Sequence, residues 1–378
     1  MIYVHIPFCR SFCSYCSFYS STKTREIPGV LDCIAMEWKR DRELWLNIFR
    51  SAELSPGHTL YFGGGTPTVC TARELSALIT LLREDMQQAG LEIAELTVEA
   101  NPGDLTPEYC QAMLEAGVNR LSIGVQSFHD EYLKAMRRRH NGRQAEDSAR
   151  LARRAGFANI SLDLMFGFPG LTAPMWKETL AHAIALRPEH ISAYQLSLEP
   201  SSPWGKRGVL PPEEACAIQY AMLQEILHHA GYIQYEVSSF CLPGKESLHN
   251  SRYWIRRPYA GLGPSAHSFN GKDRYANVAD LRKYTEGIHR NEPARKYDRL
   301  TARDVHNERV MLSLRTCRGL SLTDMERVEG RSVADDFLKQ ITPLLERGLL
   351  IRTGNKVRIP ADRLFVSDDI IRDCLLPG

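Results

Sequence analysis

The feature of this sequence that most restricts its fold is a repeated alternation of short and long segments from the N-terminus to about residue 200. Short runs rich in β-branched and aromatic residues are each followed by a longer segment with the apolar periodicity of an amphipathic helix. The short runs are residues 2–6, 59–62, 95–99, 120–125, 160–165 and 190–198. Six such units predict an α/β fold in which parallel strands wind into a barrel-like sheet covered by helices.

Each predicted strand runs directly into a loop of unusual polar or glycine-rich composition. In chain order, these loops are CRSFCSYC, GGGTPT, EANPG, GVQSF, FGFPG and LSLEP. Parallel strands of a barrel end on the same face, and such folds carry their chemistry there. The sequence therefore predicts one functional site at the C-terminal ends of the strands.

Beyond about residue 210 the alternation weakens. A helical stretch at 212–230 and a short apolar run at 235–240 are followed by loop-rich sequence up to about residue 290. Another helical stretch, at 341–350, runs into the ribbon-like LIRTGNKVRI, which is the order of a winged helix. We therefore expect a barrel domain over residues 1–210, a barrel extension over 211–298, and a smaller winged-helix-like α+β domain over 299–378.

Composition and charge narrow the class of protein. With 43% hydrophobic and 24% charged residues, the chain of 378 residues is globular, and its length favours two domains. A net charge of +2, with only Arg347 basic in the candidate recognition helix, argues against nucleic-acid binding and favours a docking or lid role for the winged helix. No apolar run is long enough to span a bilayer and no secretion signal precedes the first strand. We therefore expect a cytoplasmic protein with at most transient membrane contact.

Three cysteines follow the first predicted strand, at Cys9, Cys13 and Cys16. A four-iron cluster takes one thiolate per iron, so three protein thiolates leave one iron open to a small molecule such as S-adenosylmethionine (SAM). Reductive cleavage of the sulfonium of SAM is then chemistry that belongs to the cofactors. The alternatives are a structural zinc site, which would want a fourth close ligand, and three buried thiols. The C-x-x-x-C-x-x-C spacing is that of the radical-SAM superfamily and predicts a [4Fe–4S] cluster.

The remaining loops offer groups that fit SAM. The glycines of GGGTPT let the backbone approach the amino-acid end of a ligand, although a glycine run alone is more often a tight turn. Four polar residues stand at, near or beyond the ends of later strands: Glu99, Gln126, Arg138 and Asp163. We expect Arg138 to pair with the carboxylate of SAM, and the others to bind its ribose hydroxyls and amino group. A solvated loop residue is the alternative for each.

Several segments together resemble a known family. YVHIPFC, YFGGGTPT, EANPG, GVNRLSIGVQSF, SLDLMFGFPG and AYQLSLEP are similar to the oxygen-independent coproporphyrinogen III oxidase-like proteins, and in particular to their HemW branch of heme chaperones. The resemblance covers nearly the whole chain. It implies a partial (β/α)6 barrel and additional SAM contacts from Tyr3, Tyr15, Gly64, Gly65 and Thr66.

Two features point away from the dehydrogenase branch of the same resemblance. That branch carries a further cysteine two residues after the triad, where this chain has Phe18. It also carries a long N-terminal extension, whereas the first predicted strand of this chain begins at residue 2. Both features favour the chaperone branch over coproporphyrinogen turnover.

A third feature concerns heme. The segment HNSRYW matches the HNxxYW motif that is associated with heme binding in the chaperone branch. His249 is then the first candidate heme ligand and His267, in GLGPSAHS, the second. For a lone histidine near aromatic residues, a packing role is the alternative. The basic residues nearby that suit heme propionates are Arg252, Arg256 and Arg257.

We therefore expect a heme chaperone that holds a [4Fe–4S] cluster, SAM and heme, and delivers heme to heme-requiring apoproteins. The alternative is an enzyme that removes propionate carboxyl groups from coproporphyrinogen III by radical chemistry, or one that acts on another tetrapyrrole. The same barrel face would serve either role, and Phe18, the early first strand and the HNxxYW match favour the carrier. A third hypothesis, transcriptional regulation through the winged helix, is supported only by the order of the elements in the C-terminal region.

Overall fold

The computed structural model describes residues 1–52, 56–197, 199–200, 202–207 and 213–377. It divides into two compact units, each formed by two segments of the chain. Unit 1 consists of Met1–Gln219 and Pro258–Asp298, and unit 2 of Tyr220–Arg257 and Arg299–Gly378. The division of the sequence into three consecutive domains stays a prediction, and its first boundary, between residues 210 and 211, lies outside the described residues.

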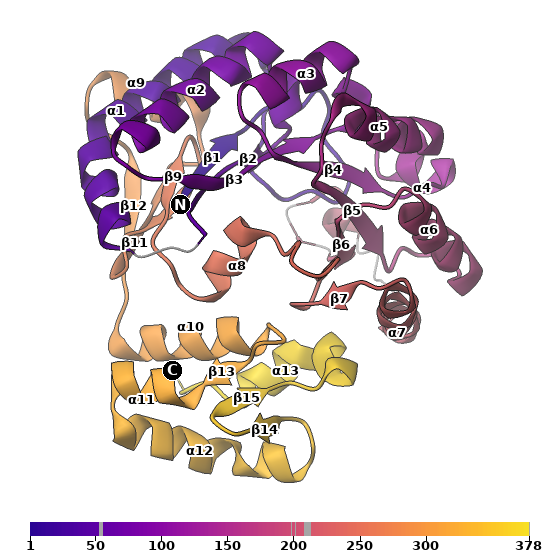
Figure 1. Ribbon diagram of the computed structural model, residues 1–378, viewed down its shortest axis with the longest axis vertical. Helices are drawn as coiled ribbons and strands as arrows, with labels where there is room; N and C mark the ends of the chain where they lie inside the picture. The colour runs from indigo at the N-terminus through magenta and orange to yellow at the C-terminus, as the bar shows by residue number, and fades with distance from the viewer. Residues whose placement is uncertain (53–55, 198, 201, 208–212, 378) are drawn as a thin grey trace. The chain divides into compact units, whose positions relative to one another are not determined.

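Unit 1 is built on a sheet of parallel strands that alternate along the chain with helices (Figure 1). The strands are β1 Ile2–Ile6, β2 His58–Gly64, β3 Ile93–Ala100, β4 Arg120–Gln126, β5 Ile160–Phe166 and β6 His190–Gln195. They lie in the order β6-β5-β4-β3-β2-β1, and β9 (Ala260–Leu262) pairs in parallel with the free side of β1. The six predicted strands and the partial-barrel α/β fold are thus confirmed, although β6 ends at Gln195, before the predicted end at Leu198, which lies outside the described residues.

The helices that connect these strands begin with local signals the sequence provides. They are α1 Ile27–Ser51, α2 Ala72–Gln88, α3 Pro107–Glu115, α4 Asp130–Ala135, α5 Gly142–Ala155 and α6 Ala173–Ala185, and α7 Glu213–His229 follows β6. At the start of α2, the Thr71 hydroxyl accepts the Glu74 N–H and the Glu74 carboxylate accepts the Thr71 N–H. Such a capping box satisfies two amides that a helix otherwise leaves unpaired.

The two faces of the sheet differ in chemistry. Along β4, Leu121, Ile123 and Val125 are buried and apolar, whereas Arg120 and Ser122 alternate with them and point to the opposite face. The same alternation along β3 and β5 puts a glutamate and an aspartate on that opposite, inner face. The apolar core of the unit therefore lies between sheet and helices, and the inner face is polar.

The expectation of loop-rich sequence up to about residue 290 is wrong. That stretch contains α8 Leu248–Trp254, β9, β10 His267–Phe269, β11 Asp273–Asn277 and α9 Leu281–His289, and β12 Arg295–Arg299 extends the sheet of β10 and β11. Long-range contacts stabilise these short elements. The fully buried Glu37 carboxylate of α1 accepts hydrogen bonds from Asn277, Tyr284 and Arg295. Short strands with charged residues carry no periodic signal that would reveal them in the sequence.

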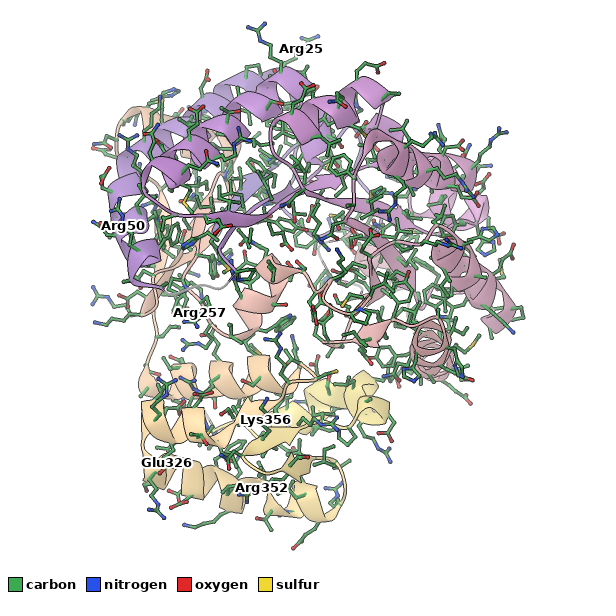
Figure 2. All side chains as sticks on the ribbon, in the orientation of Figure 1. Arg25, Arg50, Arg257, Glu326, Arg352 and Lys356 are labelled. Atoms are coloured by element: carbon green, nitrogen blue, oxygen red, sulfur yellow. The ribbon has the colours of Figure 1, made fainter. Side chains whose placement is uncertain are left out.

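Unit 2 contains the predicted C-terminal domain. Its elements are β7 Ile233–Gln234, β8 Ser239–Cys241, α8, α10 Ala302–Leu314, β13 Leu320–Ser321, α11 Leu322–Glu329, α12 Arg331–Glu346, β14 Ile351–Thr353, β15 Lys356–Arg358 and α13 Ser367–Arg372. The hairpin of β14 and β15 follows the last long helix, α12, which confirms the winged-helix-like order, and β13, which precedes α11, pairs with β15. Figure 2 shows Arg352 and Lys356 on the two strands of the hairpin. Among the helices of the described residues, none combines the length and apolar composition needed to cross a lipid bilayer.

Candidate functional site

The cysteine loop leaves the end of β1 and is closed at its base by backbone hydrogen bonds. The Cys9 N–H donates to the Ser21 carbonyl at 3.0 Å, and the Ser21 N–H donates to the Pro7 carbonyl at 2.6 Å. Between these points, Cys9, Cys13 and Cys16 are partly exposed free thiols. The loop is therefore anchored to the sheet, and its three cysteines remain partly exposed.

Cys9 and Cys16 lie in surroundings that disfavour a free thiolate. Burial raises the pKa of Cys9 and of Cys16, so both are protonated at neutral pH without metal and release protons when they bind it. Within the part of the chain that the structure describes, no group of three or more His, Cys, Asp or Glu side chains is gathered around a position for one metal ion. A four-iron cluster places each thiolate on a different iron, so its ligands need not converge on one point.

The glycine loop after β2 is shaped by its contacts with β1. A Cβ atom on Gly64, whose φ is +107°, would lie 2.5 Å from Nδ1 of His5, and one on Gly65 would lie 2.7 Å from the Phe8 carbonyl oxygen. The Thr66 N–H donates to that same carbonyl at 2.8 Å, and the Thr66 hydroxyl is 3.6 Å from the Cys9 sulfur. Packing against the protein thus accounts for the glycines, and their contact with a ligand stays a prediction.

Glu99 lies on the inner face of the sheet. The Tyr61 hydroxyl donates to its Oε1 at 2.8 Å, and the Gly64 N–H donates to its Oε2 at 3.2 Å. Burial raises the pKa of Glu99 to about 7, and the hydrogen bond from Tyr61 partly offsets this effect. The ring of Tyr3 lies beside that of Tyr61, with 6.1 Å between their centroids. The site therefore joins the glycine loop to a carboxyl group that titrates near neutrality.

Asp163 on β5 is the second carboxyl group of this face. The Ser122 hydroxyl lies 3.1 and 3.2 Å from its two carboxylate oxygens. Burial raises the pKa of Asp163 to about 6, against the opposing effect of the Arg120 charge. Its charge also contributes to the raised pKa of Glu99. Two carboxyl groups in a low-dielectric lumen favour a cationic or hydroxyl-rich ligand.

Gln126 and Arg138 meet over Gly124. A Cβ atom on Gly124 would lie 3.1 Å from Nε2 of Gln126 and 3.2 Å from Nη2 of Arg138, so a larger residue there would displace these two side chains by a few tenths of an ångström. Gln126 has a φ of +66° at an irregularity in the β4–β5 register. A left-handed residue other than glycine costs about 1–2 kcal/mol and is often found where function requires it. The fold thus orients this side chain at some energetic expense.

The guanidinium of Arg138 lies between the cysteine loop and the inner face. Its Nη2 donates to the Gly124 carbonyl at 2.6 Å and its Nη1 to the Cys13 sulfur at 3.5 Å, while its Nε is buried without a hydrogen-bond partner among the described residues. The same cation opposes the effect of burial, which raises the pKa of the neighbouring Tyr15. A buried guanidinium with an unused donor fits a carboxylate ligand beside a thiolate-bound cluster.

The two candidate heme ligands lie in different units. In unit 2, His249 is 1% exposed, and its Nε2 lies 3.0 Å from the Tyr253 hydroxyl one turn along α8. Near it, Arg252 is buried, Arg256 pairs with Glu308 at 2.7 Å, and Arg257 is exposed after the helix (Figure 2). In unit 1, His267 is exposed at the start of β10. The HNxxYW spacing thus also has a local explanation, because it places a histidine and a tyrosine at i and i+4.

Sequence reasoning missed Tyr61 and Ser122, which hydrogen-bond the two carboxylates. The signal that could have found them is strand alternation, since Tyr61 faces Tyr3 in the register of β1 and β2, and Ser122 faces Glu99 in that of β3 and β4.

A parallel α/β partial barrel that presents three thiols beside a buried arginine defines a radical-SAM type of protein. The model of the Radical SAM superfamily matches residues 3–183, and that of the HemN C-terminal domain matches residues 300–362. In the structure of coproporphyrinogen III oxidase (HemN) from Escherichia coli, the fold recurs with a TM-score of 0.84 at 24% identity, over 99% of this chain and 89% of that one.

The closer comparison is with heme chaperones. The chain is 34% identical to heme chaperone HemW of Bacillus subtilis over 97% of either chain, and 33% identical to that of Lactococcus lactis over 99% of this chain and 97% of the relative. It therefore belongs to the HemW family within the radical-SAM superfamily. Membership of that superfamily implies a [4Fe–4S] cluster and SAM as cofactors.

Proposed function

We propose that this protein is a heme chaperone, which binds heme and delivers it to heme-requiring apoproteins. The observation that carries the proposal is the similarity to heme chaperones HemW over almost the entire chain. Phe18, at the position of the additional cysteine of the dehydrogenase branch, supports it. We therefore favour the carrier over the alternative of coproporphyrinogen III turnover.

In this proposal, the cluster is held by Cys9, Cys13 and Cys16, and SAM lies against the inner face of the sheet. Arg138 binds the carboxylate of SAM, because it is a buried cation with an unused donor. Glu99, Gln126 and Asp163 bind its hydroxyl and amino groups, and Tyr3 and Tyr15 line its pocket. The backbone of Gly64, Gly65 and Thr66 binds its methionine end. When bound, the reduced cluster supplies the electron for cleavage of the sulfonium.

Heme is proposed to bind through His249 or His267. The two histidines differ in how readily their imidazole rings can ligate iron, so we test both. The Nε2 of His249 is occupied by the Tyr253 hydroxyl, so iron ligation through that atom requires the hydrogen bond to open. The imidazole of His267 belongs to an exposed residue and needs no such opening.

The test is a spectroscopic heme titration of the anaerobic protein with its cluster. We expect a stoichiometric Soret shift in the wild type, its loss or displacement in His249→Ala or His267→Ala, and no change in His228→Ala, an exposed histidine on α7. A triple variant in which Cys9, Cys13 and Cys16 are replaced by alanine tests whether heme binding depends on the cluster. The absence of a stoichiometric shift in the wild type would exclude the carrier. Formation of a vinyl product from coproporphyrinogen III with SAM and reductant would favour the enzyme.

A further inference from the structure

Ser14, between the second and third cysteines of the loop, is more tightly held than its neighbours. It is 3% exposed, although Cys13 and Tyr15 on either side are partly exposed. Its N–H donates to the Met136 carbonyl at 3.1 Å, and its hydroxyl donates to the Ala135 carbonyl at 3.0 Å. One serine thus binds the cysteine loop to the C-terminal end of α4.

This end of α4 leads directly into Arg138. The chain turns after Met136, and the Arg138 N–H donates to the Leu133 carbonyl at 2.8 Å, which fixes the direction of the turn. From there the Arg138 side chain returns to the Cys13 sulfur at 3.5 Å. The hydrogen bonds of Ser14 and the contact of Arg138 with Cys13 therefore both join the cysteine loop to the turn after α4.

A second anchor also joins these segments. Asp104, in the loop after β3, has a side chain only 3% exposed. Its carboxylate accepts from Nη2 of Arg139 at 2.8 and 2.9 Å and from the Thr68 hydroxyl at 3.2 Å, and pairs with Nε of Arg10 at 3.5 Å. Arg139 follows Arg138, and Arg10 follows Cys9. One buried carboxylate therefore links the cysteine loop, the glycine loop and the turn that carries Arg138.

We propose that Ser14 and Asp104 are positioning residues that hold the guanidinium of Arg138 against the sulfur of Cys13. Through this contact they set the reduction potential of the cluster and the affinity for SAM. The proposal rests on the cluster and SAM sites of the proposed function. A cation beside a thiolate ligand favours the reduced, more negative state of a cluster, and hydrogen bonds around the sulfurs tune its potential.

The first experiment measures the midpoint potential of the reconstituted cluster without SAM, by redox titration followed by electron paramagnetic resonance. Ser14→Ala changes no charge, so any shift reports on position alone. We expect a more negative potential in Ser14→Ala, a value nearer the wild type in Ser14→Thr, which retains a hydroxyl, and the wild-type value in Ser17→Ala. Ser17 is an exposed serine of the same loop and serves as the matched control. Iron content is measured for every variant.

The second experiment asks whether the effect passes through Arg138. We expect Arg138→Gln to make the potential more negative and to weaken SAM binding, and Ser14→Ala to add little in that background, because coupled residues are not additive. We expect Asp104→Asn to weaken SAM binding as measured by calorimetry. Asp147→Asn, on the exposed surface of α5, should leave it unchanged.

Equal potentials in wild type and Ser14→Ala, or an equal shift with and without Arg138, would overturn the proposal. Unchanged SAM affinity in Asp104→Asn would overturn the positioning role proposed for Asp104. None of these measurements involves heme, so a negative heme titration leaves the inference standing. Failure of the wild type to hold a cluster at all would overturn both.

Discussion

The raised pKa of Glu99 predicts that SAM affinity depends on pH. The groups that face its carboxyl come from several strands: Tyr61 from β2, Arg120 from β4, Asp163 from β5 and Tyr3 from β1. Burial dominates and raises the pKa to about 7. SAM carries positive charge and hydroxyl donors, so it favours the ionised carboxylate. Binding therefore lowers this pKa and releases a proton, and affinity rises as the pH rises through about 7.

The size of the effect follows from the fraction of Glu99 that is ionised. With a pKa of about 7, the protonated form weakens apparent affinity by a factor of about 11 at pH 6.0 and about 1.3 at pH 7.5. The dissociation constant should therefore rise about eightfold from pH 7.5 to pH 6.0. Asp163, with a pKa of about 6, makes the dependence steeper below that pH.

Isothermal titration calorimetry of the cluster-containing protein measures this dependence. Titrations in two buffers of different ionisation enthalpy also count the released protons. Glu99→Gln should flatten the dependence between pH 6.5 and 7.5, whereas Glu108→Gln, an exposed glutamate on α3, should keep it. A dissociation constant that does not change with pH, or an equal change in Glu99→Gln, would refute the reasoning.

Three further predictions concern single residues. Gly64→Ala should lower the thermal midpoint and weaken SAM binding, because its methyl group would lie 2.5 Å from the ring of His5 at a φ of +107°; an unchanged melting curve would contradict this. Glu37→Ala should destabilise unit 1 by about 3–5 kcal/mol in denaturant unfolding, because it removes the fully buried carboxylate that accepts hydrogen bonds from Asn277, Tyr284 and Arg295; a loss below about 1 kcal/mol would disprove it. Cys13→Ser should lose most of the iron on reconstitution, whereas Cys70→Ser, at a buried cysteine of the core, should keep it.

The parts of the site that the sequence revealed are those that depend on local pattern. Strand periodicity located the six strands, and the loop compositions located the three cysteines and the glycine run. The backbone conformation of Gln126 and the surroundings of His249 do not follow from the residue type alone. The left-handed backbone of Gln126 arises where the register between two strands shifts, and the enclosure of His249 arises from its partner on α8. The register shift at Gln126 has no signature in composition or spacing, whereas the contact of His249 with Tyr253 follows from their i, i+4 spacing on one helix.

The sequence by itself determined the class of fold and the chemistry on offer, because alternation of strand and helix is a local property and three thiolates at this spacing have few uses. Only the tertiary structure decided how that chemistry is arranged. Ser14 and its partner Ala135 are 121 positions apart, and Glu37 and its partner Arg295 are 258 apart. Contacts at such separations form when packed elements bring side chains together, and pattern along the chain does not encode them. The reach of Arg138 to Cys13, which joins the cluster loop to the inner face, is a product of that packing.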